Sequence, residues 1–287
     1  MTPSDLRAPE RTPSDPHAPE RAPSDPRAPE RATPDLHALE HAALSSVPAP
    51  RVAFDGPFVV RAFAGGTGRA NAASSIDPAP DAELHERIAR IEALYAAQGL
   101  PPRFRSTPLD PPGLAAALTA RGYVEKDETV ILLAPIGAIA AAEATAVARP
   151  APDADWMAVT ATAEHQTPAR RREKEGTPAL LMVPGAWITL REGDAAAAVI
   201  SVVAAGTLAG FFDLAVRPEF RRRGLAARAV RAAAHWAQTR GAAWLFCQVA
   251  AANAASLALN TGLGMAEAYR YRYLVRPQDA LPTMRFG

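Results

Sequence analysis

Apolar positions in the first half of the chain follow two different periods, which predicts a mixture of strands and helices. Strands are expected where short apolar or alternating runs lie between turn residues, at 58–63, 103–107 and 129–133. Large apolar residues recur every three or four positions over 81–98, which predicts a helix that ends at Gly99. A second helix is expected between Pro112 and Gly122.

The second half has a longer and more regular pattern of the same kind. Four strands are expected at 179–183, 186–191, 196–203 and 208–216. A helix over 219–240, a fully apolar strand at 243–249, a short helix over 252–261 and a last strand at 265–275 follow. This order of strand, helix, strand, helix and strand predicts a mixed α/β (α+β) fold with a central crossover.

The amino-terminal segment has a different character. Its first 41 residues are four decapeptide repeats rich in proline, and they carry almost no large apolar residue. Because such repeats have nothing to bury, residues 1–48 are expected to be disordered, as a functionless extension or a proline-rich docking segment. The expected organisation is then a globular first half over 51–135, a linker over 136–154 and a second half over 155–277.

Composition narrows the function classes. The 287 residues include 31 basic and 30 acidic side chains, so the net charge of +1 gives no reason to expect nucleic acid or a membrane as partner. The single cysteine, Cys247, excludes a disulfide framework and is expected to be a buried, inert thiol. The uncharged run 195–212 is interpreted as two buried strands rather than a membrane span. A cytoplasmic protein without a metal is expected.

The segment 212–227 carries the chemistry. A strand ends at Val216, Pro218 prevents further pairing, and three arginines and Gly224 precede a helix. The first turn of a helix has backbone N–H groups without partners and carries partial positive charge, which suits a diphosphate. A glycine at this position lets the ligand approach the backbone.

This segment resembles the acyl-CoA loop of the GCN5-related N-acetyltransferases. The matching residues are Val216, Pro218, Arg221, Gly224 and Ala226, and downstream Asn253, Ser256, Leu257, Leu259 and the stretch 262–265 resemble the closing segment of the same family. The first half, through 69–77, 99–107 and 121–123, is similar to the degenerate amino-terminal half of tandem members. The resemblance implies a twisted mixed sheet whose central parallel strands splay apart.

It also implies the ligands and their positions. Acetyl-CoA would be the acyl donor, and the acceptor would be a primary amine of a small molecule. The implied donor contacts are backbone groups of Leu214, Ala215 and Val216 for the pantetheine arm, and Arg221, Arg222, Arg223, Gly224, Leu225, Ala226 and Ala227 for the diphosphate. Asn253 would contact the pantetheine side, although an asparagine there also suits a helix N-cap.

The catalytic groups are less well defined. The family usually has a tyrosine as general acid where this chain has Asn260, which cannot give up a proton at neutral pH. One of Tyr269, Tyr271 and Tyr273 could replace it, water could protonate the thiolate, or the protein could bind acyl-CoA without turnover, as a sensor. We take Tyr271 as the candidate acid and Asp213 as the candidate base. Glu192 and Glu267 are alternative bases.

The acceptor is expected between the two halves, with Arg69 and Asn71 as candidate contacts, because clefts between domains are common ligand sites. The charged run within 163–178 is interpreted as a solvated helix or loop rather than a binding patch. A monomer or homodimer is expected, and transfer to a protein amine is a weaker alternative.

Overall fold

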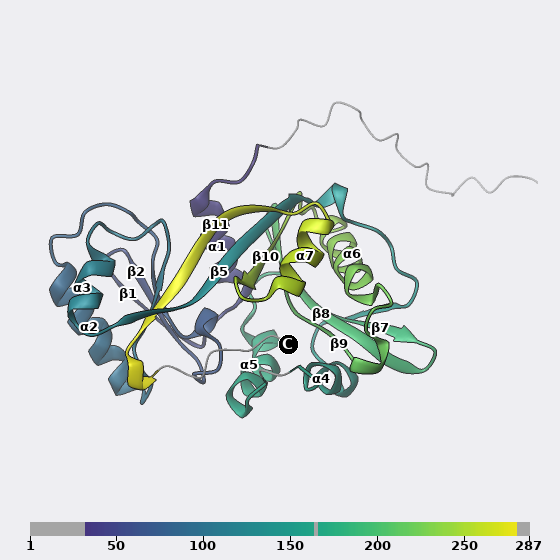
Figure 1. Ribbon diagram of the computed structural model, residues 1–287, viewed down its shortest axis with the longest axis horizontal. Helices are drawn as coiled ribbons and strands as arrows, with labels where there is room; N and C mark the ends of the chain where they lie inside the picture. Colours follow the sequence, from purple (N-terminus) through teal and green to yellow (C-terminus); the bar gives the residue numbers. More distant parts are fainter. Residues whose placement is uncertain (1–31, 164–165, 280–287) are drawn as a thin grey trace, which may run out of the picture. The chain divides into compact units, whose positions relative to one another are not determined.

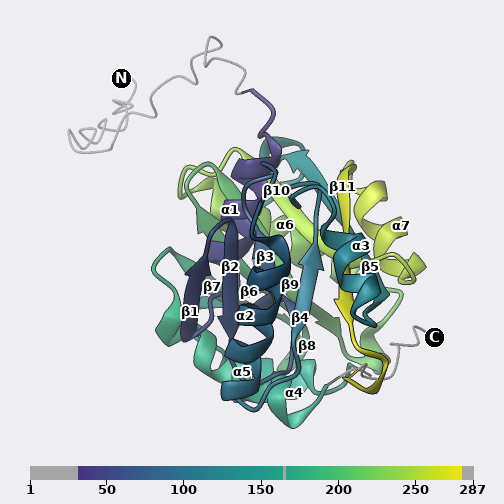
Figure 2. The ribbon, with the colours of Figure 1, turned by 90° about the vertical axis from the view of Figure 1, so that its left-hand side faces the viewer.

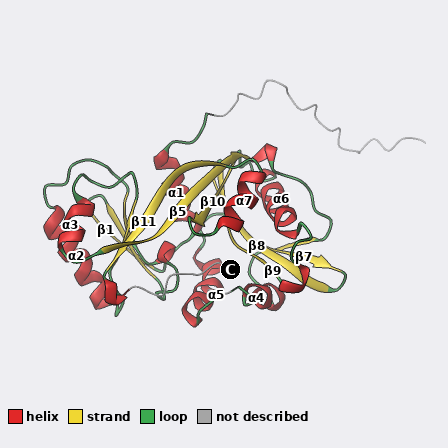
Figure 3. Cartoon of the chain, viewed as in Figure 1, coloured by secondary structure: helices red, strands yellow, loops and turns green. Residues whose placement is uncertain are grey.

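The computed structural model of the chain describes residues 32–163 and 166–279, and those from Pro34 onward form one unit. Eleven strands make a single mixed sheet, in the order β1-β2-β3-β4-β11-β5-β10-β9-β8-β7-β6 (Figures 1 and 3). The strands are β1 (Arg51–Asp55), β2 (Phe58–Ala62), β3 (Ala73–Ser75), β4 (Arg103–Ser106), β5 (Val124–Pro135), β6 (Ala146–Arg149), β7 (Gly185–Glu192), β8 (Ala195–Ala205), β9 (Leu208–Val216), β10 (Trp244–Ala250) and β11 (Ala266–Val275).

Helices cover both faces of this sheet. The α-helices are α1 (Leu36–Ser46), α2 (Leu84–Ala97), α3 (Leu114–Ala120), α4 (Ala154–Thr160), α5 (Pro168–Leu180), α6 (Leu225–Gln238) and α7 (Ala254–Gly262). Helices α2 and α3 lie together over strands of the first half, residues 51–135 (Figure 2). In the second half, residues 155–277, α6 packs on one face of the sheet, and α1 and α4 pack on the other.

The predicted elements agree with this arrangement except in a few segments. The run 195–212 contains β8, a turn at Gly206 and the start of β9, so it is the expected pair of buried strands. No helix in the part of the chain that the structure describes is long and apolar enough to cross a membrane. The strand predicted at 179–183 is wrong, because α5 continues through Leu180.

Disorder through residue 48 is also contradicted. Residues Leu36–Ser46 form α1, whose N-cap Asp35 accepts a hydrogen bond from the Ala38 amide at 2.8 Å. Leu39, Ala42 and Ala43 pack against the sheet and are at most 6% exposed. The last decapeptide has no proline beyond position 34, so it can continue as a helix. The first three repeats, up to residue 31, lie outside the described residues.

The expected linker contains regular structure as well. Strand β6 lies within it and pairs antiparallel with β7, over the register Ala146↔Leu190 to Arg149↔Trp187. Strand β5, the last strand of the first half, lies between β10 and β11 and is antiparallel to both. The two halves therefore share one sheet.

Candidate active site

Two central parallel strands separate and leave a gap at the middle of the sheet. Strand β10 pairs with β9 only from Trp244↔Leu208 to Phe246↔Gly210, although both strands continue for several residues. On its other edge β10 remains paired with β5 along its whole length. Beyond Gly210, the edge of β9 that faces β10 therefore has no neighbouring strand among the described residues.

A β-bulge in β9 adds to this separation. The register with β8 moves from Val199↔Ala215 to Ser201↔Phe212, so one extra residue of β9 lies in the interval. Asp213 lies at this bulge with a left-handed φ of 54°, which is rare for a residue with a side chain. The bulge directs Asp213 into the cleft described below and leaves Leu214, Ala215 and Val216 beside the gap.

The loop between β9 and α6 has the properties of an anion site. Among the described residues, the backbone N–H groups of residues 222–227 have no hydrogen-bond acceptor. Gly224 precedes α6 with a φ of 76°, and nothing lies within 4 Å of the position that a Cβ would take. No carboxylate in the described ranges pairs with the exposed side chains of Arg221, Arg222 and Arg223. The loop therefore fits a diphosphate.

Helix α7 follows β10 in the chain, and the two asparagines that the sequence singles out lie at its N-cap and within it. The Oδ1 of Asn253 accepts a hydrogen bond from the Ser256 amide at 2.9 Å, so Asn253 is the N-cap of α7. Asn260 is 1% exposed, and its Nδ2 donates to the Ser256 carbonyl at 2.9 Å. Its Oδ1 has no partner within the described part of the chain. Asn260 is therefore a buried side chain that carries no acidic proton.

A cleft of about 710 Å³, counting its open mouth, lies beside the bulge. Its walls come from the end of α1, the Gly-rich turn after β2, one face of α5, and strands β7, β8 and β9. The aromatic side chains on these walls are Phe63, Trp187 and Phe212, and the charged ones are Arg69, Arg170, Glu173, Lys174 and Asp213. As predicted, the cleft joins residues of both halves.

The candidate base Asp213 forms an ion pair in this cleft. Its carboxylate accepts a hydrogen bond from Lys174 Nζ. Burial alone would raise the pKa of Asp213, but the nearby cations of Lys174, Arg69 and Arg170 outweigh that effect and hold the pKa below its usual value. Asp213 is therefore an ionised group with little tendency to accept a proton. Glu192 and Glu267 form ion pairs with Arg228 and Arg270, both at 2.8 Å.

The candidate acid Tyr271 lies behind the cleft wall. It is 2% exposed, and its hydroxyl donates to Gln248 Oε1 at 2.8 Å. Gln248 in turn accepts from Arg69, which lines the cleft, through Oε1 at 3.2 Å and through its backbone carbonyl at 2.9 Å. Burial would raise the pKa of Tyr271, but the charges of Arg69 and Arg105 lower it overall. Tyr271 therefore reaches the cleft only through Gln248 and Arg69.

The other two tyrosines of β11 are held elsewhere. Tyr269 donates its hydroxyl to Glu40 of α1, and burial raises its pKa. Tyr273 is 8% exposed and contacts the backbone at Gly68, and burial also raises its pKa. Cys247 is a buried free thiol, and burial raises its pKa to about 12. These groups are poor proton donors at neutral pH.

Asn71, the second residue expected to contact the acceptor substrate, makes its side-chain hydrogen bonds within the protein. Its Oδ1 accepts from the Phe63 and Gly65 amides, and its Nδ2 donates to the Thr67 carbonyl and to Glu173. Asn71 is 4% exposed and does not line the cleft. Its place is structural, because it fixes the Gly-rich turn against α5.

The face of α5 is what sequence reasoning missed. The charged run was interpreted as solvated, yet Arg170, Glu173, Lys174 and Thr177 all line the cleft. Their spacing of three, one and three residues places them on one side of a helix. That spacing among polar residues was the available signal, and the intervening Arg171, which pairs with Glu175 and is largely exposed, is the solvated face.

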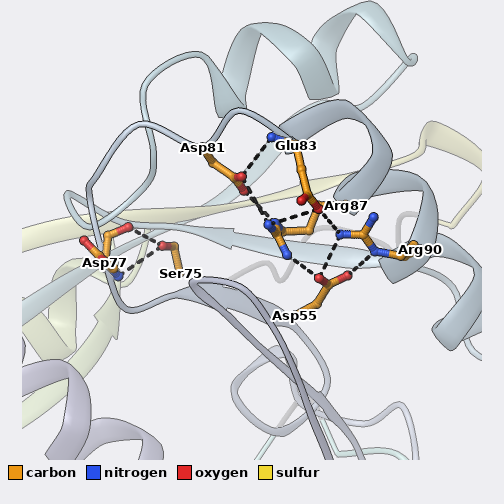
Figure 4. Close-up of polar contacts among 7 residues, drawn as sticks. All are labelled: Asp55, Ser75, Asp77, Asp81, Glu83, Arg87 and Arg90. Carbon is orange, nitrogen blue, oxygen red and sulfur yellow. Dashed lines mark hydrogen bonds and ion pairs between the residues drawn. The ribbon is translucent and has the colours of Figure 1, made fainter.

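The first half contains a counterpart of the β9–α6–β10 unit. Strands β3 and β4 are parallel and are connected by α2. The loop before α2 is acidic, and two of its side chains accept from its amides. Asp77 accepts from the Ala79 amide at 3.0 Å. Asp81 accepts from the Glu83 amide at 3.1 Å (Figure 4). Two of its amides are therefore occupied by its own carboxylates, whereas no carboxylate among the described residues accepts from the amides of the loop before α6.

Comparisons with known proteins agree with this geometry. A family model described as "Probable histone acetyltransferase Rv0428c C-terminal" matches residues 33–274. The uncharacterized N-acetyltransferase YobR of Bacillus subtilis (strain 168) is 23% identical over 243 residues, which cover 83% of this chain and 97% of that protein.

Solved structures give the same fold. A GCN5-related N-acetyltransferase from Kribbella flavida has a TM-score of 0.64 and 18% identity, and the match covers 86% of this chain and 97% of that one. A tandem GNAT protein from the clavulanic acid biosynthesis pathway has a TM-score of 0.57 and 14% identity, covering 79% and 83%. The chain belongs to the acetyltransferase family that its residues 33–274 match, within the GCN5-related N-acetyltransferases.

Proposed function

We propose that the protein transfers an acetyl group from acetyl-CoA directly to the primary amine of a small molecule. The observation that carries this proposal is the row of backbone amides over residues 222–227, which have no protein acceptor in the described structure and begin a helix beside the gap between β9 and β10. The helix dipole and three arginines add positive charge at the same place.

Acetyl-CoA supplies the activated acetyl group. The amides of residues 222–227 would bind its diphosphate, and the backbone of Leu214–Val216 along the unpaired edge of β9 would bind its pantetheine arm. Holding the thioester at the gap brings it next to the cleft, and orientation of this kind supplies a large part of the acceleration. The ammonium ion first loses a proton to water, and the free amine then attacks the thioester carbonyl. The carbon–nitrogen bond forms, the carbon–sulfur bond breaks, and the second proton from nitrogen passes through water to the departing thiolate.

Asp213 has a position at the bulge from which it would hold the ammonium form of the acceptor. The lowered pKa of Asp213 makes it a better anion than base. Tyr271 and Arg69 both donate to Gln248 Oε1, and a guanidinium cannot take up a proton, so Tyr271 would position Arg69 through Gln248, and water would protonate the thiolate. Asn260 has no acidic proton and would not protonate the donor.

Calorimetric titration with acetyl-CoA tests the donor site. The variant Gly224→Glu places bulk and negative charge where the diphosphate would bind, and like charges about 4 Å apart near a protein surface repel by roughly 4 kcal/mol. We expect it to weaken binding about tenfold or more. Gly206→Glu is the matched control, because Gly206 also has a left-handed backbone with open space around it, in the turn between β8 and β9. Equal affinity of the two variants would refute the donor site.

A non-catalytic acyl-CoA sensor is the alternative that Asn260 favours, since the position of the usual acid has no ionisable group. Release of free CoA thiol, measured with a broad panel of amines, separates the two functions. Release above the rate of hydrolysis with any amine ends the sensor alternative, and saturable acetyl-CoA binding without such release would favour it.

A further inference from the structure

The charges that line the cleft are unequal. Three cations, Arg69, Arg170 and Lys174, face two carboxylates, Glu173 and Asp213. A primary amine arrives as an ammonium ion, and an excess of positive charge opposes it. An acceptor that binds well therefore needs a second group, besides its amine, that positive charge attracts.

Both carboxylates are already engaged. Glu173 accepts hydrogen bonds from the Gly66 and Thr67 amides and from Asn71 Nδ2, each at 2.7 Å. Asp213 pairs with Lys174. Neither carboxylate forms an ion pair with the remaining two cations among the described residues.

Arg69 and Arg170 are thus the cleft cations that contact no carboxylate directly among the described residues. Arg69 donates only to the neutral Gln248. The guanidinium of Arg170 has no hydrogen-bond or ion-pair partner within the described ranges, although it lies on the inward face of α5. Burial, and after it the charge of Arg69, lowers the pKa of Arg170, so the two guanidinium groups lie within electrostatic reach of each other.

We propose that the acceptor carries an oxyanion, a carboxylate or a phosphate, in addition to its amine, and that Arg170 binds this group together with Arg69. The inference rests on the proposed function. Guanidinium groups bind such oxyanions through paired hydrogen bonds, and a negative group between them relieves their mutual repulsion. Lys174 contacts Oδ1 of Asp213, so Oδ2 of the same carboxylate would hold the ammonium end nearer the bulge. Phe63, Trp187 and Phe212 give an apolar wall for the rest of the molecule.

These features favour an amino acid with an apolar side chain, and they disfavour a lysine-rich basic peptide. The test compares acceptors that differ only in the anion. Phenylalanine is measured against phenylalaninamide and phenethylamine, and O-phosphoethanolamine against ethanolamine, by initial rates of CoA thiol release. A lysine-rich peptide is included as the opposite charge type.

Arg170→Gln removes the proposed contact, and Arg171→Gln is the matched control on the exposed face of the same helix. We expect kcat/KM for at least one oxyanion-bearing acceptor to exceed that of its anion-free partner about tenfold or more. Arg170→Gln should remove this preference through KM, and Arg171→Gln should keep it. Preference for the anion-free amine or the peptide, or equal behaviour of the two variants, would overturn the inference.

Acetyl-CoA binding is measured first, because its absence would overturn the proposed function and the inference with it. Where acetyl-CoA binds and no amine is acetylated, phenylalanine and O-phosphoethanolamine are titrated into CoA-loaded protein. Binding of either that weakens about tenfold in Arg170→Gln, and not in Arg171→Gln, supports the oxyanion site even if transfer fails. No binding of either compound by protein that binds CoA would overturn the oxyanion site alone.

Discussion

At the scale of single residues, Asp213 shows how local backbone and distant charge combine. The bulge gives it a left-handed conformation and directs its carboxylate into the cleft. Lys174, 39 residues earlier, then pairs with it, and together with Arg69 and Arg170 lowers its pKa. A carboxyl group whose pKa lies below about 3.9 stays ionised throughout the neutral range, whereas an alkylammonium ion has a pKa of about 10.

Asp213→Asn should therefore impair binding of the charged amine more than proton transfer. We expect its KM for the acceptor at pH 7 to rise about tenfold or more, the equivalent of one hydrogen bond to a charged group. Because the folded pKa of Asp213 is lowered, its charge is constant above pH 5, so the effect should shrink only when the amine itself deprotonates. Initial rates between pH 6 and 10 check this, with Asp194→Asn in the exposed β7–β8 turn as control. A fall in kcat at unchanged KM would instead assign Asp213 to proton transfer.

Residues whose role depends on the local backbone were predictable from the sequence. Gly224 and the arginines before it belong to one loop, so their spacing alone predicts their arrangement. The partners of Arg69 and Asn71 were not predictable, because Gln248 and Glu173 are more than 100 positions away. The sequence gives a side chain's chemistry, whereas tertiary contacts decide whether that chemistry is free for a ligand.

At the scale of elements, the units β3–α2–β4 and β9–α6–β10 each connect two parallel strands through a helix, but the loops before the two helices carry opposite charge. The loop before α6 carries three arginines, whereas α2 begins after Asp77, Asp81 and Glu83. In the first half Asp77 and Asp81 accept hydrogen bonds from amides of their own loop. Asp81 pairs with Arg87, Glu83 pairs with Arg90, and Asp55 of β1 pairs with both arginines (Figure 4). Negative charge at a helix N-terminus stabilises the helix and repels a phosphate.

One acetyl-CoA should therefore bind per chain. Calorimetry on the intact protein should give a stoichiometry near one, and the Gly224→Glu variant should lose that single site without revealing a second. A stoichiometry of two would mean that the acidic loop before α2 also binds acetyl-CoA, against this prediction.

A buried ion pair adds to the apolar packing that holds helix α1 against the sheet. Glu40 of α1 is 0% exposed and pairs with Arg105 of β4, which is 3% exposed in its side chain. Glu40 also accepts from Tyr269, so the pair joins α1 to the first half and to β11. The end of α1 forms part of the cleft wall, and this pair therefore supports the acceptor site indirectly.

Glu40→Gln should be strongly destabilising, because it leaves the Arg105 charge buried without compensation. Breaking a buried pair in this way costs about 3–5 kcal/mol of unfolding free energy. Glu175→Gln, which breaks the exposed pair with Arg171, should cost about 0–1 kcal/mol. Urea denaturation of the two variants gives the comparison, and similar midpoints for both would contradict the role assigned to Glu40.

At the scale of the whole molecule, the sequence predicts which segments are helices and which are strands. It predicts only in part which strands pair with one another. The patterns over 208–216 and 243–249 predicted the two central strands, because short apolar runs bounded by turn residues and a crossover helix are local signals. No local pattern in the sequence indicates that β5 lies between β10 and β11. Strand pairing is decided by which edges remain open when the whole sheet assembles, and that depends on residues more than 100 positions apart.

The position of β5 between β10 and β11 makes the second half dependent on the first. Strand β5 pairs with β10 from Thr129↔Ala250 to Pro135↔Trp244, and with β11 from Val124↔Val275 to Leu133↔Ala266. A fragment of residues 136–287 retains the acyl-CoA loop but loses β5, so it exposes two long strand edges and part of the central core. It should not unfold cooperatively and should not bind acetyl-CoA, whereas the fragment 32–287 should do both. Thermal unfolding followed by circular dichroism, with parallel acetyl-CoA titration, makes the comparison. Cooperative unfolding and saturable binding by the shorter fragment would mean that the second half folds without the strand that the first half supplies.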